Sequence, residues 1–555
     1  MATSTPHVTA AVANPVVTDL TVCIFSPTES PSTCELDPRI WHRLEKDLYL
    51  YTSEQSAWVY VALANEEELA AEDLVVADIR VGEPPPPNPS PGHSWESRPG
   101  GIWVLRSKFS GKIDQAVTEV DVLFGIDAVD PRPQWVLMRS PLQLNAQPNV
   151  PVARLSMLSG RAKPQQPGAR AALRVREDGK FKIVQISDTH TVTGVGVCRD
   201  AIDSHGKNLP ESDADPLTVN FISKILDVEK PDLVVLTGDQ LHHDIPDSQS
   251  ALFKVVAPII ERSIPFAAVF GNHDSEGIHE LDRFALQDST AQMSILENLP
   301  FSLCEPGPEQ VDGIGNFCLQ VLAPAPSQHP LSTLYFLDSH GQIPSKTRHP
   351  DYDPIKQSQI DRFTNTSQAQ RRAREKDDHN DNNNHLSLTF LHIPLPEFGD
   401  HHLNIRNGHR REPTEGPSFN SHFYDALVKE GISALGCGHD HVNDFCALLP
   451  PRQRTQQQDS DGDKKPPHQP AAAAGPWLCY GGGSGFGGYC SYGRKRFHRR
   501  TRVWELDTTG GSLRTWKRVE YAVDRVDEMV LVEGGAVVDD PAGEGGEEAG
   551  RCVVS

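Results

Sequence analysis

Three mainly apolar runs, each followed by a cluster of polar residues, most constrain how this chain can fold. They cover residues 181–186, 232–237 and 265–270. A run of this length and composition is typical of a buried parallel strand. Ligands bind just beyond the carboxyl ends of such strands. The sequence therefore predicts that five polar side chains meet at one edge of one sheet: Asp188, His190, Asp239, Asn272 and His273.

The order of the clusters separates them from chance matches. An Asp-x-His triplet alone carries little weight in a chain with 23 His, and it recurs at Asp203, Asp338 and Asp400. The copy at Asp188 differs because Gly-Asp and then Gly-Asn-His-Asp follow it, each after its own apolar run. Two more histidine clusters follow strand-like runs later in the chain, and they contain His392, His439 and His441. We therefore interpret the five clusters as one site.

In this order, the motifs resemble those of the calcineurin-like metallophosphoesterase superfamily, which includes the purple acid phosphatases. The likeness covers roughly residues 174–507. Residues 214–218, 229–240 and 438–445, with the glycine run that ends at Tyr489, are most similar to fungal phosphatases with a cell-cycle role and to plant purple-acid-phosphatase-like proteins. The resemblance implies an α/β fold in which two packed β-sheets are flanked by helices, with the site along the edges of the sheets.

The resemblance also implies a role for each ligand. One metal ion would be held by Asp188, His190 and His441, a second by Asn272, His392 and His439, and Asp239 would bridge both. Carboxylate, imidazole and amide ligands together suit first-row metals such as Fe, Mn or Zn. Two such ions about 4 Å apart can share a hydroxide for in-line attack on phosphorus.

The residues beside these ligands have expected roles too. His273 faces the same pocket, and we interpret it as the general acid or electrostatic stabiliser for the leaving alkoxide. Asp274 is expected to orient His273, as carboxylates orient catalytic imidazoles; a helix cap is its alternative role. Purple acid phosphatases have a metal-binding Tyr three residues after the bridging Asp, and here that position is His242. The tyrosinate colour should then be absent, and the preference for iron is in doubt. We expect His242 and His243 to face outward from a loop; the alternative is that one of them reaches a metal.

Two short stretches look like other functional motifs but are interpreted structurally. Residues 481–488 are rich in Gly, yet they lack the Lys-Ser/Thr ending of a P-loop. We expect them to let the backbone pass close to the site. The basic run at residues 494–500 could be a nuclear-import signal, but we expect it to be a solvated edge before a strand at 502–506.

The distribution of periodic segments predicts two domains. A β-rich accessory domain is expected over residues 1–165, with one helix after Asp37, and a metallophosphoesterase domain over residues 171–520. In the second domain, strands alternate with helical patterns, which is typical of an α/β layered fold. Polar insertions near 366–385 and 450–476, and the acidic, Gly-rich tail at 534–555, are expected to be disordered.

Composition limits the classes of partner. The formal net charge of -23 argues against a sequence-independent nucleic-acid binder and against a polybasic membrane-surface protein. Ten Cys are too sparse for a disulfide scaffold, so most are expected to be reduced. No apolar run approaches the roughly 20 residues of a membrane span, and no signal-peptide pattern is evident. We therefore expect a cytoplasmic protein, with the nucleus as the alternative location.

The expected function is hydrolysis of phosphate monoesters, in phosphoproteins or in small molecules. A phosphodiesterase that acts on nucleotides or lipids is the alternative, because the same metal pair serves both reactions. A non-catalytic interaction scaffold on the same fold is a third hypothesis. That hypothesis predicts that ligands have been lost, whereas all seven are present in this chain.

Overall fold

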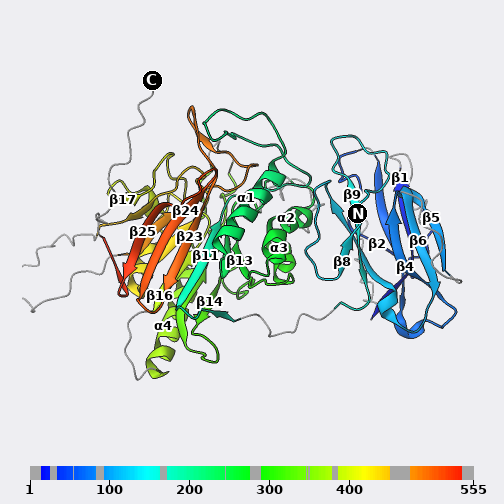
Figure 1. Ribbon diagram of the computed structural model, residues 1–555, viewed down its shortest axis with the longest axis horizontal. Helices are drawn as coiled ribbons and strands as arrows, with labels where there is room; N and C mark the ends of the chain where they lie inside the picture. Colours follow the sequence, from blue (N-terminus) through cyan, green and yellow to red (C-terminus); the bar gives the residue numbers. More distant parts are fainter. Residues whose placement is uncertain are drawn as a thin grey trace, which may run out of the picture. The chain divides into compact units, whose positions relative to one another are not determined.

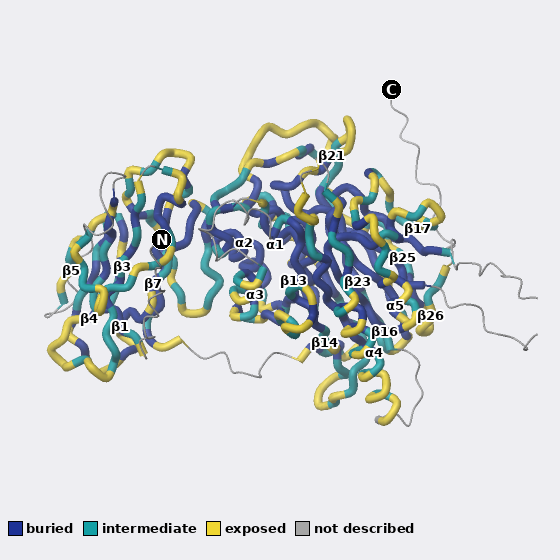
Figure 2. The backbone as a smooth tube through the Cα atoms, turned by 180° about the vertical axis from the view of Figure 1, so that it is seen from behind, coloured by how far each residue is buried: buried dark blue, intermediate teal, exposed yellow. Residues whose placement is uncertain are grey.

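The computed structural model describes most of the chain, which divides into two compact units (Figures 1 and 2). The described residues are 14–25, 34–53, 55–82, 93–162, 172–243, 245–274, 289–345, 347, 350–377, 385–450 and 475–539. The first unit consists of the chain up to residue 169 together with residues 191–196 and 245–261. The second unit contains the remainder.

The first unit is built from three three-stranded antiparallel sheets, as expected for a β-rich region. The sheets have the orders β1 (Pro15–Phe25), β3 (Ser56–Asn65), β2 (Trp41–Arg43); β4 (Leu74–Val81), β6 (Ile102–Lys108), β5 (His93–Arg98); and β7 (Val117–Phe124), β9 (Ala153–Ser159), β8 (Trp135–Leu137). Alternate residues of these strands fill one apolar core, because successive side chains point to opposite faces of a sheet. Leu20, Val59 and Val104 are examples.

Helix α2 (Ser248–Glu261) belongs to the first unit, although it lies far beyond the boundary expected at residue 165. Polar contacts join it to β7 and the turn that follows. Ser250 Oγ accepts a hydrogen bond from the backbone N–H of Phe124 at 2.8 Å, and Lys254 pairs with Asp127 at 3.0 Å. The expected linker at 160–168 lies largely outside the described residues.

The second unit contains a seven-stranded mixed sheet. Its order is β13 (Phe266–Val269), β12 (Leu233–Thr237), β11 (Lys180–Ile186), β23 (Arg500–Asp507), β24 (Ser512–Val519), β25 (Val526–Glu533) and β26 (Ala536–Val537). The first three strands are parallel, as their buried apolar runs predict, and β23 pairs antiparallel with β11. The sheet continues through β25 and β26, past the boundary expected at residue 520. The beginning of the tail at 534–555 is therefore a strand and not disordered chain, while residues 540–555 lie outside the described ranges.

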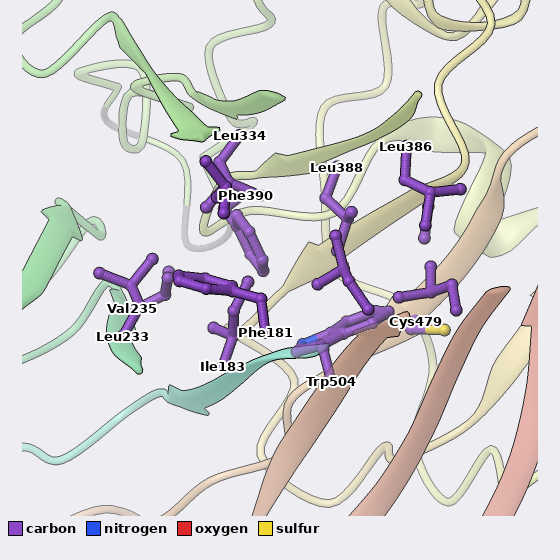
Figure 3. Close-up of a cluster of buried hydrophobic side chains, with 14 of the residues drawn as sticks. Phe181, Ile183, Leu233, Val235, Leu334, Leu386, Leu388, Phe390, Cys479 and Trp504 are labelled. Carbon is purple, nitrogen blue, oxygen red and sulfur yellow. The ribbon is translucent and has the colours of Figure 1, made fainter. Parts of the chain in front are cut away.

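An eight-stranded mixed sheet forms the second layer of this unit. Its order is β10 (Leu173–Arg174), β14 (Phe317–Leu322), β15 (Pro330–Phe336), β16 (Leu386–Phe390), β18 (Ala434–Cys437), β20 (Trp477–Tyr480), β19 (Cys446–Leu448) and β17 (Asn404–Asn407). A separate hairpin joins β21 (Ser491–Tyr492) to β22 (Lys495–Arg496). Apolar residues from both large sheets form one core. Figure 3 shows Phe181 and Ile183 of β11 and Trp504 of β23 beside Leu388 and Phe390 of β16.

Helices flank the two-sheet sandwich, and the predicted α/β fold is confirmed. Helix α1 (Ala214–Glu229) is joined to the seven-stranded sheet through Glu229, which accepts a hydrogen bond from the Trp516 indole at 2.9 Å. Helices α4 (Gln357–Asp377) and α5 (Phe423–Glu430) share an apolar cluster with the outer face of the eight-stranded sheet. Helix α3 (Ser289–Glu297) begins where the described chain resumes after Asp274.

Two predictions about local structure were wrong. The segment after Asp37 forms a turn and then β2, because Trp41–Arg43 pairs with β3 and Asp37 binds Arg39. Residues 366–377 of the first insertion are the last turns of α4. There Gln370 accepts a hydrogen bond from the Tyr335 hydroxyl at 3.1 Å, and Arg371 pairs with Glu430 at 2.5 Å. Residues 378–384 and 451–474 lie outside the described residues.

Most of the described cysteines are free, as expected, but four of them form two disulfides. The structure joins Cys23 to Cys34, and Cys446 to Cys479. The second pair lies directly opposite in register on β19 and β20, a position that spacing along the chain does not reveal. Five other described cysteines are free. No helix in the described ranges is long and apolar enough to cross a membrane.

Candidate metal centre

All seven predicted ligands lie on loops that leave the carboxyl ends of strands in the two large sheets. Asp188 and His190 follow β11, Asp239 follows β12, Asn272 follows β13, His392 follows β16, and His439 and His441 follow β18. Four of these residues have a positive φ: Asp188 (56°), His190 (46°), Asp239 (50°) and His439 (76°). Such a backbone conformation costs about 1–3 kcal/mol at a non-Gly residue, and it is typical of functional sites.

Glycines allow the ligand loops to approach one another closely. A Cβ at Gly271 would lie 2.2 Å from Asp239 Oδ1, and one at Gly488 would lie 2.6 Å from Cε1 of His441. The prediction that the run at 481–488 passes close to the site is confirmed. Arg499 holds this run by donating to the carbonyls of Gly485 and Gly488 at 2.9 and 3.0 Å. Arg499 is buried, so the expectation that the whole basic run at 494–500 is solvated was wrong.

The first group of ligand atoms gathers around Nε2 of His441. It lies 3.0 Å from Nε2 of His190 and 3.4 Å from Oδ1 of Asp188. Nε2 of His190 lies 3.7 Å from Oδ2 of Asp239. All four side chains are buried.

The second group gathers around Nε2 of His392. This nitrogen lies 3.3 Å from Oδ2 of Asp239, from Oδ1 of Asn272 and from Nδ1 of His439. Asp239 therefore takes part in both groups, and it is the residue to which the resemblance assigns the bridging role.

The spacing and chemistry of both groups fit first-row metal ions. A cation about 2.1 Å from each donor places neighbouring donors about 3.0–3.4 Å apart. Buried carboxylates need compensating positive charge, and the ion-pair partners that the described residues offer Asp188 and Asp239 are histidines. Burial and then the charge of His441 hold the pKa of His190 well below its usual range, which favours the neutral ring that a metal ligand requires.

Hydrogen bonds from the second ring nitrogen orient two of the histidines. Nδ1 of His392 contacts the carbonyl of Thr237 at 2.8 Å, and Nδ1 of His441 contacts the carbonyl of Tyr489 at 2.8 Å. Such contacts place the proton on Nδ1 and leave Nε2 free to bind a metal. The Tyr489 ring also stacks on His441, with centroids 4.0 Å apart, and its hydroxyl donates to Glu412 at 3.0 Å. Sequence reasoning named Tyr489 only as the end of the glycine run, and it missed Glu412, which belongs to no motif.

His273 lies beside the two ligand groups that share Asp239, but it belongs to neither of them. Its side chain is 28% exposed, and its Nε2 lies 4.0 Å from Oδ2 of Asp239. The expectation that Asp274 orients its ring was wrong. The Asp274 carboxylate instead accepts the backbone N–H groups of Leu241 at 2.9 Å and of Gly271 at 2.7 Å, so it joins two ligand loops.

The outward-facing arrangement expected for His242 and His243 holds for His243 but not for His242. The His242 ring is half-buried, with its centroid 5.5 Å from that of His190, and burial followed by the charge of His243 lowers the pKa of His242 to about 4. Nitrogen atoms of His190, His242 and His273 lie within 4.8 Å of one another. His243 is exposed, but its Nδ1 contacts Nδ1 of His273 at 3.2 Å.

The triplet at Asp338 has a structural role. Its carboxylate accepts the backbone N–H groups of Ile314 and His340, both at 2.8 Å. Ser339, the middle residue, accepts the N–H of Ile393 at 2.8 Å and so holds the loop that presents His392. The triplet therefore supports the site without being one of the groups that could bind a metal.

Comparison with known proteins agrees with this geometry. Residues 181–443 match the family of calcineurin-like phosphoesterases. Phosphatase DCR2 of Saccharomyces cerevisiae is 35% identical over 420 residues, and the match covers 73% of this chain and 64% of that protein. The chain thus matches less than two thirds of that relative's length. Probable inactive purple acid phosphatase 29 of Arabidopsis thaliana is 33% identical, and the match covers 65% of this chain and 88% of that protein.

Among solved structures, a dimetal phosphatase from Danio rerio overlaps 64% of this chain and 99% of its own, with a TM-score of 0.37 and 11% identity. The family match covers the ligand loops, and the chain shares at least 33% identity with the yeast and Arabidopsis relatives. These two findings establish the classification. The chain belongs to the calcineurin-like phosphoesterase family.

Proposed function

We propose that this protein is a phosphatase that hydrolyses phosphate monoesters, in phosphoproteins or in small molecules. The observation that carries the proposal is the pair of buried ligand groups that share Asp239. Asp188, His190 and His441 would hold one metal ion, and Asn272, His392 and His439 the other. Bound there, two first-row ions would lower the pKa of a shared water and neutralise charge on the phosphoryl group.

The protein's own residues would orient the substrate and protonate the leaving group. His273 would direct its Nε2 toward the oxygen of the departing alcohol and give it a proton. A cavity of about 530 Å³, lined in part by Tyr352, Gln342 and Ser418, lies beside the second ligand group. The Tyr352 ring meets His439 edge-on, with centroids 4.9 Å apart. This cavity would receive the part of the substrate attached to the phosphoryl group.

The Arabidopsis relative is named a probable inactive phosphatase, and a non-catalytic scaffold is therefore the second candidate. Such a protein need not preserve a metal-binding arrangement. Here, the donor atoms of all seven ligands lie at spacings that fit two ions. This observation supports an active hydrolase.

A comparison of substrates tests the proposal. We expect turnover of 4-nitrophenyl phosphate at least about tenfold faster than that of bis(4-nitrophenyl) phosphate, with release of phosphate from a phosphoserine peptide panel. The Asp239→Asn variant, purified in the same way, controls for contaminating phosphatases. Faster turnover of the diester would favour the phosphodiesterase hypothesis. If neither compound nor any peptide is turned over by metal-loaded protein, the scaffold hypothesis is correct.

A further inference from the structure

The two ring nitrogens of His273 have different neighbours: one lies near Asp239 and the other contacts a second histidine. Its Nε2 lies 4.0 Å from Oδ2 of Asp239, while its Nδ1 lies 3.2 Å from Nδ1 of His243. The two rings are 5.2 Å apart between centroids and inclined by 31°. Two ring nitrogens at this separation form a hydrogen bond only if one carries a proton and the other accepts it.

Asp274, which the sequence predicts to orient His273, instead holds the loop that carries His243. Asp274 accepts the N–H of Leu241, two residues before His243, and the N–H of Gly271, two residues before His273. Nε2 of Gln240 donates to the carbonyl of Val269 at 2.9 Å and joins the same two segments. The Asp274 carboxylate therefore joins the loop of His243 to the loop of His273, whereas the side chain that contacts the His273 ring is the imidazole of His243.

We propose that His243 is a positioning residue for His273: its Nδ1 accepts the Nδ1–H of His273 and so makes Nε2 the nitrogen that gives up its proton. The inference rests on the proposed phosphatase function. As the bond between phosphorus and the leaving oxygen breaks, its electron pair takes the proton from Nε2 to form an O–H bond. The Nδ1–H of His273 remains bonded to His243 throughout. This role is the one that a carboxylate fulfils for a catalytic imidazole in other hydrolases.

The arrangement predicts a loss of rate without a loss of binding. His243→Ala should lower kcat for an alkyl phosphate about tenfold, the effect of one hydrogen bond to a catalytic group, with KM unchanged. Turnover of 4-nitrophenyl phosphate should change by less than about twofold, because nitrophenolate departs without a proton. His243→Asn, which keeps an acceptor near the position of Nδ1, should restore most of the rate.

Matched variants separate this role from a structural one. His401 is exposed and lies outside the ligand groups that share Asp239, and His401→Ala should leave both substrates unaffected. In a double-mutant cycle, His243→Ala should add no further loss in a His273→Ala background, because both changes remove the same proton donation. Additive losses would contradict the proposal, as would an unchanged kcat in His243→Ala.

A spectroscopic measurement distinguishes failure of this inference from failure of the proposed function. In ¹⁵N-histidine-labelled protein, the Nδ1 resonance of His273, assigned with His273→Ala, should shift in His243→Ala toward that of a solvent-exposed ring. It should stay in place in His401→Ala. A wild-type protein that turns over no phosphate ester would refute the phosphatase proposal. An unshifted His273 resonance would refute the hydrogen bond to His243, whether or not the protein is active.

Discussion

His273→Ala is expected to lower turnover of alkyl phosphates by about 10²–10⁴, the range for loss of a general acid, while both metal ions remain bound. The ring lies next to Asn272 in sequence, but its Nε2 lies 4.0 Å from Oδ2 of Asp239, whereas His392 approaches that oxygen to 3.3 Å. Its Nδ1 contacts His243, so Nε2 is the ring nitrogen that lies nearer to Asp239. The loss should be much smaller for 4-nitrophenyl phosphate, whose leaving group needs no proton.

Two results would contradict this role for His273. Equal losses on alkyl and nitrophenyl substrates would mean that the ring contacts only the phosphoryl group. Loss of one metal equivalent would make His273 a ligand, an arrangement made geometrically feasible by the nearby nitrogens of His190 and His242. Steady-state kinetics on both substrates, paired with metal analysis of the same preparation, separates the three possibilities.

Asp239→Asn is expected to abolish most activity and to lower metal content at both sites. The buried carboxylate is shared by the two ligand groups, and its neighbours His392 and His273 hold its pKa well below the usual range, although burial alone would raise it. An amide in its place has similar shape but cannot neutralise a cation. We expect turnover to fall by at least about 10²-fold, the cost of losing one preorganised electrostatic contact.

Asp203→Asn is the matched control for this substitution. Asp203 begins another Asp-x-His triplet, and its carboxylate accepts backbone N–H groups of His205 and Lys207 at 2.9 Å, outside the ligand groups. This variant should keep two metal ions and wild-type turnover. Normal metal stoichiometry and near-normal turnover in Asp239→Asn would contradict the bridging assignment.

The sequence predicted the parts of the site that depend on strand order. Parallel strands β11, β12 and β13 place their carboxyl ends at one edge, so Asp188, Asp239 and Asn272 must come together once the strands are identified. The apolar runs identify the strands, and each polar motif directly follows its own strand in the sequence. The same reasoning located His392 and His441 after β16 and β18.

Contacts between loops could not be predicted in this way. Whether His243 or Asp274 reaches the His273 ring depends on side-chain directions in two loops about 30 residues apart, and no periodic pattern encodes them. The helical end of α4 was missed for a similar reason. Its polar residues 366–377 suggest a solvated loop, yet Gln370 and Arg371 find partners on β15 and α5 that only the folded chain brings near.

Metal analysis of the purified wild-type protein tests the central claim most directly. The two ligand groups around Asp239 predict two first-row metal ions per chain. Removal of both by a chelator should abolish turnover of 4-nitrophenyl phosphate, and adding back a first-row metal should restore it. Undiminished turnover in protein that contains less than one metal ion per chain would contradict the binuclear site.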